Sequence, residues 1–244
     1  MTDKIKIFLK DLLAGLLVFL PARPNRAVIL MYHSLGDNGK FFTVKPADFS
    51  LQLDYLKRHK YNVVSLAVLS GYLTAGKIPP RTVVITFDDG YADNYSIAFP
   101  ELKKHGFPAT IFLATGLPFS GLSLLTNDQI SEMIASALID FEPHTVSHAK
   151  LTKIDLAEAR REIVESRISV ERLCQKSASY FAYPYGCYNQ QIIELLKTNG
   201  FELALTVAKG VVSPKSNRWL LKRNAIDSAV SPVQFKAIVK FGKR

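Results

Sequence analysis

Two adjacent carboxylates, Asp88 and Asp89, directly follow an apolar and β-branched run at residues 83–86. Because such a run is typical of a buried strand, both carboxylates are expected where a strand ends and a loop begins. Two neighbouring anions repel each other, so a nearby cation must compensate them. His144 and His148, which follow another predicted strand, offer imidazole ligands for such a cation. One carboxylate with two imidazoles is the three-ligand set typical of a catalytic divalent metal site.

A site with three protein ligands leaves coordination positions open for water and substrate. The metal would lower the pKa of a bound water and polarise a carbonyl group, while the second carboxylate takes the proton from the attacking water. Zinc is the default cation for this set, and cobalt, nickel or manganese fit the same ligands. A lone His-x-x-x-His pair is usually structural, and both aspartates could cap the helix expected near residue 93. Their joint position at two strand ends favours the metal site.

Strand-like and helix-like segments alternate along the chain, which predicts an α/β fold with a parallel sheet that closes into a barrel. The carboxyl ends of such strands face the active site. The strands are predicted at residues 27–31, 62–65, 83–86, 109–113, 139–141, 180–183, 203–207 and 220–226. The helices are predicted at residues 46–58, 66–75, 93–105, 126–137, 155–173, 190–199 and 232–239.

The chain has 244 residues, of which 48% are hydrophobic, so it is long enough for one large domain with a real core. Its net charge of +10 is compatible with nucleic acid, an anionic membrane or an anionic substrate. Nucleic acid ranks lowest, because the basic residues are scattered and no nucleic-acid motif accompanies them.

The two cysteines, Cys174 and Cys187, do not form a disulfide scaffold. Two reduced thiols are favoured over a disulfide bond between these cysteines. Reduced thiols weakly favour a reducing compartment.

Residues 1–22 form an apolar N-terminal segment, separated by a proline-containing linker from the domain predicted at residues 27–244. The uncharged part, residues 12–22, is too short to span a bilayer, which needs roughly 20 helical residues. Apolar residues at positions 5, 8, 9, 12, 13, 16, 17 and 20 share one helical face. A helix lying in a membrane surface and a helix packed on the base of the barrel explain this pattern equally well. A cleaved signal peptide fits less well, because the residues at 20 and 22 make a poor cleavage site.

Three short motifs carry a resemblance to a known family: Thr86-Phe87-Asp88-Asp89-Gly90, His144-Thr145-Val146-Ser147-His148 and Tyr183-Pro184-Tyr185-Gly186. They resemble the first three motifs of the polysaccharide deacetylases, which are the NodB homology domains of carbohydrate esterase family four. The resemblance covers roughly residues 27–226, in order and at plausible spacing. It implies a distorted (β/α)-barrel of about seven parallel strands. It also implies a metal-dependent hydrolase that removes N-acetyl, and sometimes O-acetyl, groups from sugars.

The resemblance assigns roles to individual positions of this chain. Asp88 resembles the general base of the family, and Asp89, His144 and His148 resemble its metal ligands. Tyr185 matches the residue whose backbone N–H helps to hold the oxyanion. Such a donor is worth about 3–4 kcal/mol in comparable sites.

Two departures from the family pattern concern the base and the acid. Ala182 stands where the third motif usually begins with an arginine that braces the base, and Arg223 could take over this role or simply be a surface arginine. The usual C-terminal histidine acid is absent, since no histidine follows residue 148, and we expect His33 to replace it. The Met-Tyr-His sequence that ends at His33 resembles the branch of biofilm poly-N-acetylglucosamine deacetylases, whose acid is N-terminal.

These residues predict a metal-dependent enzyme that removes the N-acetyl group of an amino sugar in a polysaccharide or a lipid-linked saccharide. Aromatic residues could line a sugar groove or the core, and Tyr32, Tyr183 and Pro184 are the candidate substrate contacts. The alternative is a carbohydrate-binding protein on the same fold without activity, suggested by the missing arginine and histidine. Peripheral membrane contact through residues 1–22 favours the cell envelope, although a cytoplasmic location fits the composition as well.

Overall fold

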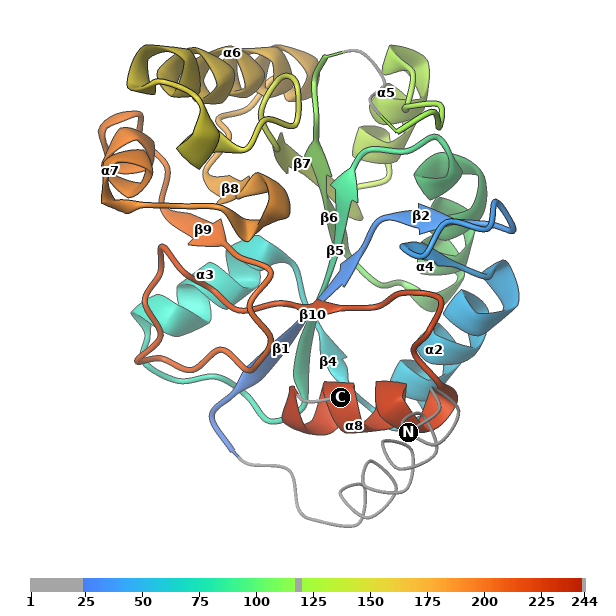
Figure 1. Ribbon diagram of the computed structural model, residues 1–244. Coiled ribbons are helices and arrows are strands. Elements are labelled where there is room, and N and C mark those ends of the chain that lie inside the picture. Colours follow the sequence, from blue (N-terminus) through green and yellow to red (C-terminus); the bar gives the residue numbers. More distant parts are fainter. Residues whose placement is uncertain (1–23, 117–119, 243–244) are drawn as a thin grey trace, which may run out of the picture.

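The computed structural model describes residues 24–116 and 120–242 (Figure 1). The helix predicted in residues 1–22 therefore lies outside the described residues, and its place relative to the domain stays a prediction. Within the described ranges, every helix is too short or too polar to cross a bilayer.

A parallel sheet of six strands forms the centre of the molecule (Figure 1). Its strands follow the order β10-β1-β5-β6-β7, and β4 pairs with the first residues of β5. The strands are β1 (Ala27–Tyr32), β4 (Asn62–Val63), β5 (Thr82–Asp89), β6 (Ala109–Leu113), β7 (Ile139–Pro143) and β10 (Asn224–Ala225). This arrangement confirms the predicted α/β fold with a parallel sheet.

Strands β1 and β5 are buried along their whole length, because helices and loops cover both faces of the sheet. Their apolar side chains alternate between two hydrophobic clusters: Leu30 and Ile85 face one cluster, whereas Ile29 and Val84 face the other. A continuous apolar sequence is typical of strands buried in this way. The helices around the sheet are α2 (Pro46–Arg58), α3 (Leu66–Thr74), α4 (Phe99–His105), α5 (Asn127–Ala135), α6 (Leu156–Cys174), α7 (Gln190–Thr198) and α8 (Pro232–Phe241).

The predicted closure of the sheet into a barrel is not confirmed. Strands β8 (Tyr180–Ala182) and β9 (Leu203–Leu205) form a separate parallel pair. One bridge, between Leu205 and Leu221, connects this pair toward β10, and the described residues show no strand ladder between β7 and β8. The strand predicted at residues 220–226 is correspondingly reduced to β10 and this bridge.

Two further differences from the predicted elements have local causes. The helix predicted at residues 93–105 begins with a π-helical turn, Asn94–Ala98, before α4. Pro100 explains the irregular start, because it has no amide hydrogen for the regular ladder. Between the strand predicted at residues 27–31 and the helix predicted at residues 46–58, the chain contains a short parallel pair, β2 (Ser34–Leu35) and β3 (Thr43–Val44).

A buried glutamate side chain connects β7 to β8 where their backbones do not pair. Glu142 of β7 accepts hydrogen bonds from the amides of Ser179 and Tyr180, at 3.0 and 2.9 Å. These are the first amides of the β8 region, so the carboxyl group replaces a strand neighbour for them. Burial raises the pKa of Glu142 to about 8, even though the two amides and Lys176 favour its charged form.

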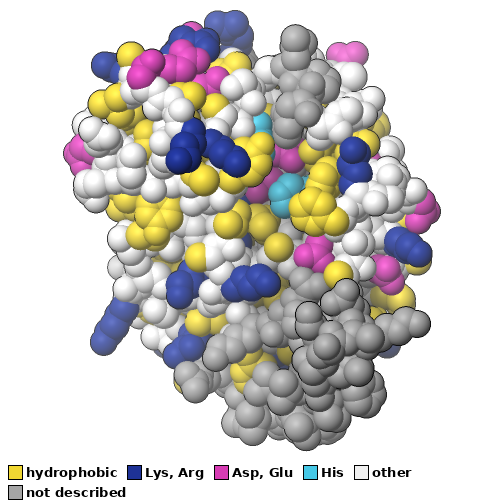
Figure 2. All heavy atoms as spheres, viewed as in Figure 1, with side chains coloured by type: hydrophobic (Ala, Val, Ile, Leu, Met, Phe, Trp, Pro, Cys, Tyr) yellow, Lys and Arg dark blue, Asp and Glu magenta, His cyan; other side chains and the backbone are white. Residues whose placement is uncertain are grey.

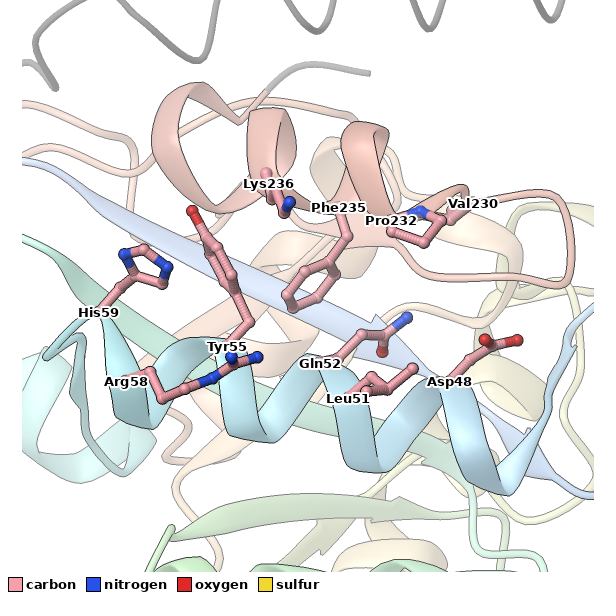
Figure 3. Close-up of a pocket in the computed structure, with 10 residues that line it drawn as sticks. All are labelled: Asp48, Leu51, Gln52, Tyr55, Arg58, His59, Val230, Pro232, Phe235 and Lys236. Atoms are coloured by element: carbon pink, nitrogen blue, oxygen red, sulfur yellow. The ribbon is translucent and has the colours of Figure 1, made fainter.

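Helices α2 and α8 border a groove of about 260 Å³ (Figure 3). Tyr55 of α2 and Phe235 of α8 point into it from opposite sides, and their rings meet edge to face with centroids 6.2 Å apart. Charged and polar side chains, including Asp48 and Lys236, stand at its margins (Figure 3). The residues that line this groove are different from those of the cavity described below.

The raised pKa of Glu142 predicts a pH dependence of folding stability. Between about pH 4.5 and pH 8 the folded protein keeps a proton that the unfolded chain loses, so the free energy of unfolding falls as pH rises, by up to about 1.4 kcal/mol per pH unit. Glu142→Gln keeps an acceptor oxygen and removes the titration, so its stability should fall less over this range. Urea unfolding of both proteins in EDTA at several pH values measures the difference, and parallel curves would contradict the assignment.

Candidate active site

A cavity of about 400 Å³ opens at the carboxyl ends of the sheet strands. Figure 2 shows histidine and acidic side chains at the bottom of a hollow that hydrophobic side chains border. The lining residues are Met31, His33, Phe41, Phe42, Asp88, Asp89, Tyr91, Ser120, His144, His148, Tyr185, Val207, Ala225, Ile226 and Asp227. The volume lies in the range of sites for small molecules.

The end of β5 directs two neighbouring carboxylates into this cavity. Asp89 and Gly90 both have left-handed backbone angles, with φ of 75° and 79°, so the chain turns sharply there. The φ of Gly90 favours glycine, and a Cβ atom at this position would lie 2.5 Å from the end of the Leu113 side chain, which would have to move. Because of this turn, Asp88 and Asp89 both line the cavity although they contact different side chains.

Asp89, His144 and His148 form a cluster that fits a divalent cation. Each offers one ligand atom, and these atoms lie within 4.8 Å of one another. The Asp89 Oδ1 atom lies 3.3 Å from His148 Nε2 and 3.7 Å from His144 Nε2. This oxygen is buried and has no hydrogen-bond donor among the described residues, which is costly unless a cation satisfies it. The structure thus brings together the three residues that the sequence predicts as ligands.

A second contact orients one of the imidazoles. His144 Nδ1 lies 2.7 Å from the carbonyl oxygen of Ala182, which assigns the hydrogen to Nδ1 and leaves the Nε2 lone pair facing Asp89. Burial also lowers the pKa of His144 to about 3 and that of His148 to about 4, so both rings are neutral. Neutral imidazoles are the form that binds metal. Burial and the charge of Asp88 raise the pKa of Asp89 to about 7, and a bound cation would reverse this effect.

Arg223 forms a buried, two-fold ion pair with Asp88. Its Nη1 and Nη2 atoms donate to the two carboxylate oxygens, at 2.6 and 2.7 Å, and its Nε donates to the carbonyl of Thr206. Burial by itself would raise the pKa of Asp88, but the guanidinium outweighs this and holds the pKa below its ordinary value. Arg223 has no exposed surface, so the alternative of a surface arginine is wrong.

His33 follows β1 and lines the cavity together with Asp227. The ring is half-buried, and burial lowers its pKa, whereas the charges of Asp88 and Asp227 oppose this shift. The sequence analysis did not predict Asp227 as a site residue, although Asp227 directly follows the last predicted strand and could have been identified by this position.

Tyr185 lies at the rim of the cavity, with half of its surface exposed. Its ring meets the His148 ring edge-on, with centroids 4.5 Å apart, and Lys150 Nζ lies 4.7 Å from the ring centroid. The residue has a φ of 57°, so the third motif turns sharply here and presents Tyr185 next to the metal ligands.

The candidate substrate contacts Tyr32, Tyr183 and Pro184 need correction, because all three are buried away from the cavity. Tyr32 donates its hydroxyl to Gln52, and Tyr183 donates to the carbonyl of Trp219. The alternation of side chains along a strand explains the error for Tyr32: its neighbours at 31 and 33 line the cavity, so Tyr32 points to the opposite side.

Other aromatic side chains line the cavity instead. Phe42 stacks on Tyr91 with centroids 5.8 Å apart, and Phe41 at the mouth is 78% exposed. Both phenylalanines lie in the loop between β2 and β3, which has no strand-end signal that would have indicated them.

Comparison with known proteins gives consistent matches. The sequence profile of the family described as polysaccharide deacetylase matches residues 75–204. Poly-β-1,6-N-acetyl-D-glucosamine N-deacetylase of Staphylococcus epidermidis is 32% identical over 213 residues, which cover 82% of this chain and 72% of that protein. The structure of IcaB from Ammonifex degensii is similar with a TM-score of 0.81, at 26% identity over 92% of this chain and all of that one. The deacetylase PplD of Streptococcus pyogenes, in complex with acetate, gives a TM-score of 0.79 at 28% identity, over 87% of this chain and 97% of that one.

The geometry of the cluster predicts which variants lose metal. Asp89→Asn removes the charged ligand oxygen and His148→Ala removes one imidazole. Changes outside the ligand set typically weaken binding about 10- to 100-fold, so loss of a ligand should weaken it more. Metal content after zinc loading and desalting, measured by mass spectrometry, checks this. His59→Ala is the control, because His59 is exposed at the end of α2 and outside the cavity. If either ligand variant kept an undiminished metal content, the assignment of these residues as metal ligands would be wrong.

Proposed function

The chain belongs to the polysaccharide deacetylase family and is a carbohydrate deacetylase, and we propose that it removes the N-acetyl group from N-acetylglucosamine units of a polysaccharide. One observation carries this proposal. A carboxylate held ionised by Arg223 stands beside the three-ligand cluster, at the bottom of one cavity. This combination provides a base next to a cation site, as hydrolysis of an amide requires.

Asp88 acts as the general base. Its Oδ2 atom lies 3.9 Å from His144 Nε2, so a water molecule beside the ligand cluster is within its reach. A divalent cation at Asp89, His144 and His148, with zinc as first choice, would supply Lewis acidity toward water and the acetyl carbonyl. Asp88 takes the proton as the water oxygen attacks the carbonyl carbon, and the ion pair with Arg223 holds the carboxylate in one orientation. A well-placed base contributes about 10²- to 10⁴-fold to the rate.

Two further groups complete the reaction. The backbone N–H of Tyr185 donates to the oxygen that becomes negative as the carbonyl is attacked. His33, which follows β1 and lines the same cavity, gives a proton to the nitrogen as the carbon–nitrogen bond breaks. The products are acetate and a sugar with a free amino group.

The lining of the cavity supports an uncharged polysaccharide as substrate. Phe41, Phe42 and Tyr185 offer apolar ring faces on which pyranose rings stack, and Phe41 and Tyr185 stand at its mouth, where a longer chain would continue. Among the described residues that line the cavity, none is lysine or arginine, and Lys150 at the rim lies against the Tyr185 ring. The Staphylococcus epidermidis relative is named for a β-1,6-linked polymer of N-acetylglucosamine, which is our first choice. Membrane contact through residues 1–22 and a place in the cell envelope stay predictions.

Acetate release from β-1,6-linked N-acetylglucosamine oligomers tests the proposal. The zinc-loaded protein should release acetate and generate free amines. Asp88→Asn should lower kcat/KM by about 10²- to 10⁴-fold and keep its metal, because the base does not belong to the ligand set. Asp128→Asn, an exposed position on α5, is the matched control. Metal binding and oligomer binding without any acetate release would instead support the non-catalytic carbohydrate-binding alternative.

The ion pair predicts how the pH profile responds to changes at Arg223. Arg223→Gln removes the positive charge that lowers the pKa of Asp88, so the base is protonated up to a higher pH and the acidic limb of kcat/KM should move to higher pH. Stability should also fall, by about 3–5 kcal/mol, because a buried carboxylate loses its partner. Arg223→Lys keeps the charge and should keep the limb near its original position. An unchanged limb in Arg223→Gln would show that Arg223 does not tune the base.

A further inference from the structure

The segment that carries both histidine ligands has an unusual backbone. Thr145 and His148 have left-handed φ angles of 69° and 57°. Thr145 is β-branched, and such residues rarely adopt this conformation, which typically costs about 1–3 kcal/mol. Strain of this size persists only where surrounding contacts enforce it.

A buried carboxylate holds the amide side of this segment. Glu162 of α6 accepts hydrogen bonds from the Val146 and Ser147 amides at 2.8 and 2.9 Å, and from the Ser147 hydroxyl at 2.6 Å. Its exposed fraction is 2%, which is rare for a glutamate. Both amides belong to the peptide units between the two histidine ligands.

The loop after β6 holds the carbonyl side of the same segment. The Thr115 and Gly116 amides donate to the carbonyls of Thr145 and Val146, at 3.1 and 2.8 Å. A Cβ atom at Gly116 would lie 2.7 Å from the Val146 oxygen, so only glycine allows this approach. The segment is therefore fixed on both sides, by Glu162 and by residues 115–116.

We propose that Glu162 is a positioning residue that sets the metal affinity of the site without touching metal or substrate. Its three hydrogen bonds hold the peptide units that place His148 Nε2 at 3.3 Å from Asp89 Oδ1. Without them the strained backbone relaxes and the imidazole leaves its place. This inference rests on the proposed function, because it requires Asp89, His144 and His148 to bind the cation.

The test compares zinc Kd values, measured by competition with a chelator, for three variants. Glu162→Ala removes all acceptors and should weaken zinc binding about 10- to 100-fold, as outer-shell changes do. Glu162→Gln keeps one acceptor oxygen for the amides and should show a smaller loss. Glu171→Gln is the matched control, since this carboxylate of the same helix accepts from the Ala178 amide and does not contact the histidine segment. It should bind zinc like the original protein.

Thermal unfolding of the metal-free proteins in EDTA separates positioning from simple stability. The inference would be overturned if Glu162→Ala unfolded at a lower temperature but kept its zinc Kd within about twofold. This result would leave the proposed function intact. If Glu162→Ala does not fold, Glu162→Asp takes its place, because the shorter side chain withdraws the carboxylate from the two amides, and an unchanged Kd there would overturn the inference equally. Failure of the unsubstituted protein to bind zinc would instead remove the proposed metal site, and the inference with it.

Discussion

The repulsion between two neighbouring buried carboxylates is the constraint on which the rest of the site depends. Asp88 and Asp89 are almost fully buried, so each requires its own compensation. Arg223 neutralises Asp88 through a two-fold ion pair, and the two imidazole nitrogens face Asp89 with room for a cation. Arg223 accordingly holds the pKa of Asp88 below its ordinary value, whereas burial and the charge of Asp88 raise the pKa of Asp89. One carboxylate is thus prepared as a base and the other as a ligand.

The position of the compensating arginine shows what the fold must preserve. The third motif has Ala182 where the family usually has arginine, and the Ala182 carbonyl accepts from His144 instead. The cation for Asp88 comes from residue 223, which lies just before β10, two strands from β5 across β1. Its guanidinium reaches both carboxylate oxygens of Asp88. In this chain the positive charge that the buried Asp88 requires therefore comes from the β10 end of the sheet.

Buried side chains connect parts of the site where the backbone ladder of the sheet is interrupted. The strand ladder is interrupted between β7 and β8 and reduced to one bridge between Leu205 and Leu221. Glu142 spans the first gap by accepting from two amides of the β8 region, and Glu162 holds the histidine segment from α6. Both glutamates are buried, and both accept from backbone amides: Glu142 at the start of β8 and Glu162 in the loop between the histidine ligands. Residues with no direct part in the reaction thereby fix the residues that carry it.

The sequence by itself determined the parallel α/β fold, because alternating apolar strands and helices have distinct periods. It also determined Asp88, Asp89, His144 and His148 as a group, since strands of one parallel sheet end at one edge. It did not decide whether Arg223 pairs with Asp88 or lies on the surface. It also predicted Tyr32, Tyr183 and Pro184 as substrate contacts, although they are buried away from the cavity. Only the tertiary structure decided these points, along with the roles of Glu142 and Glu162 and the incomplete closure of the sheet. Local patterns set the direction of each strand and the order of its residues. Which side chains meet across the sheet depends on register and packing between segments far apart in the chain.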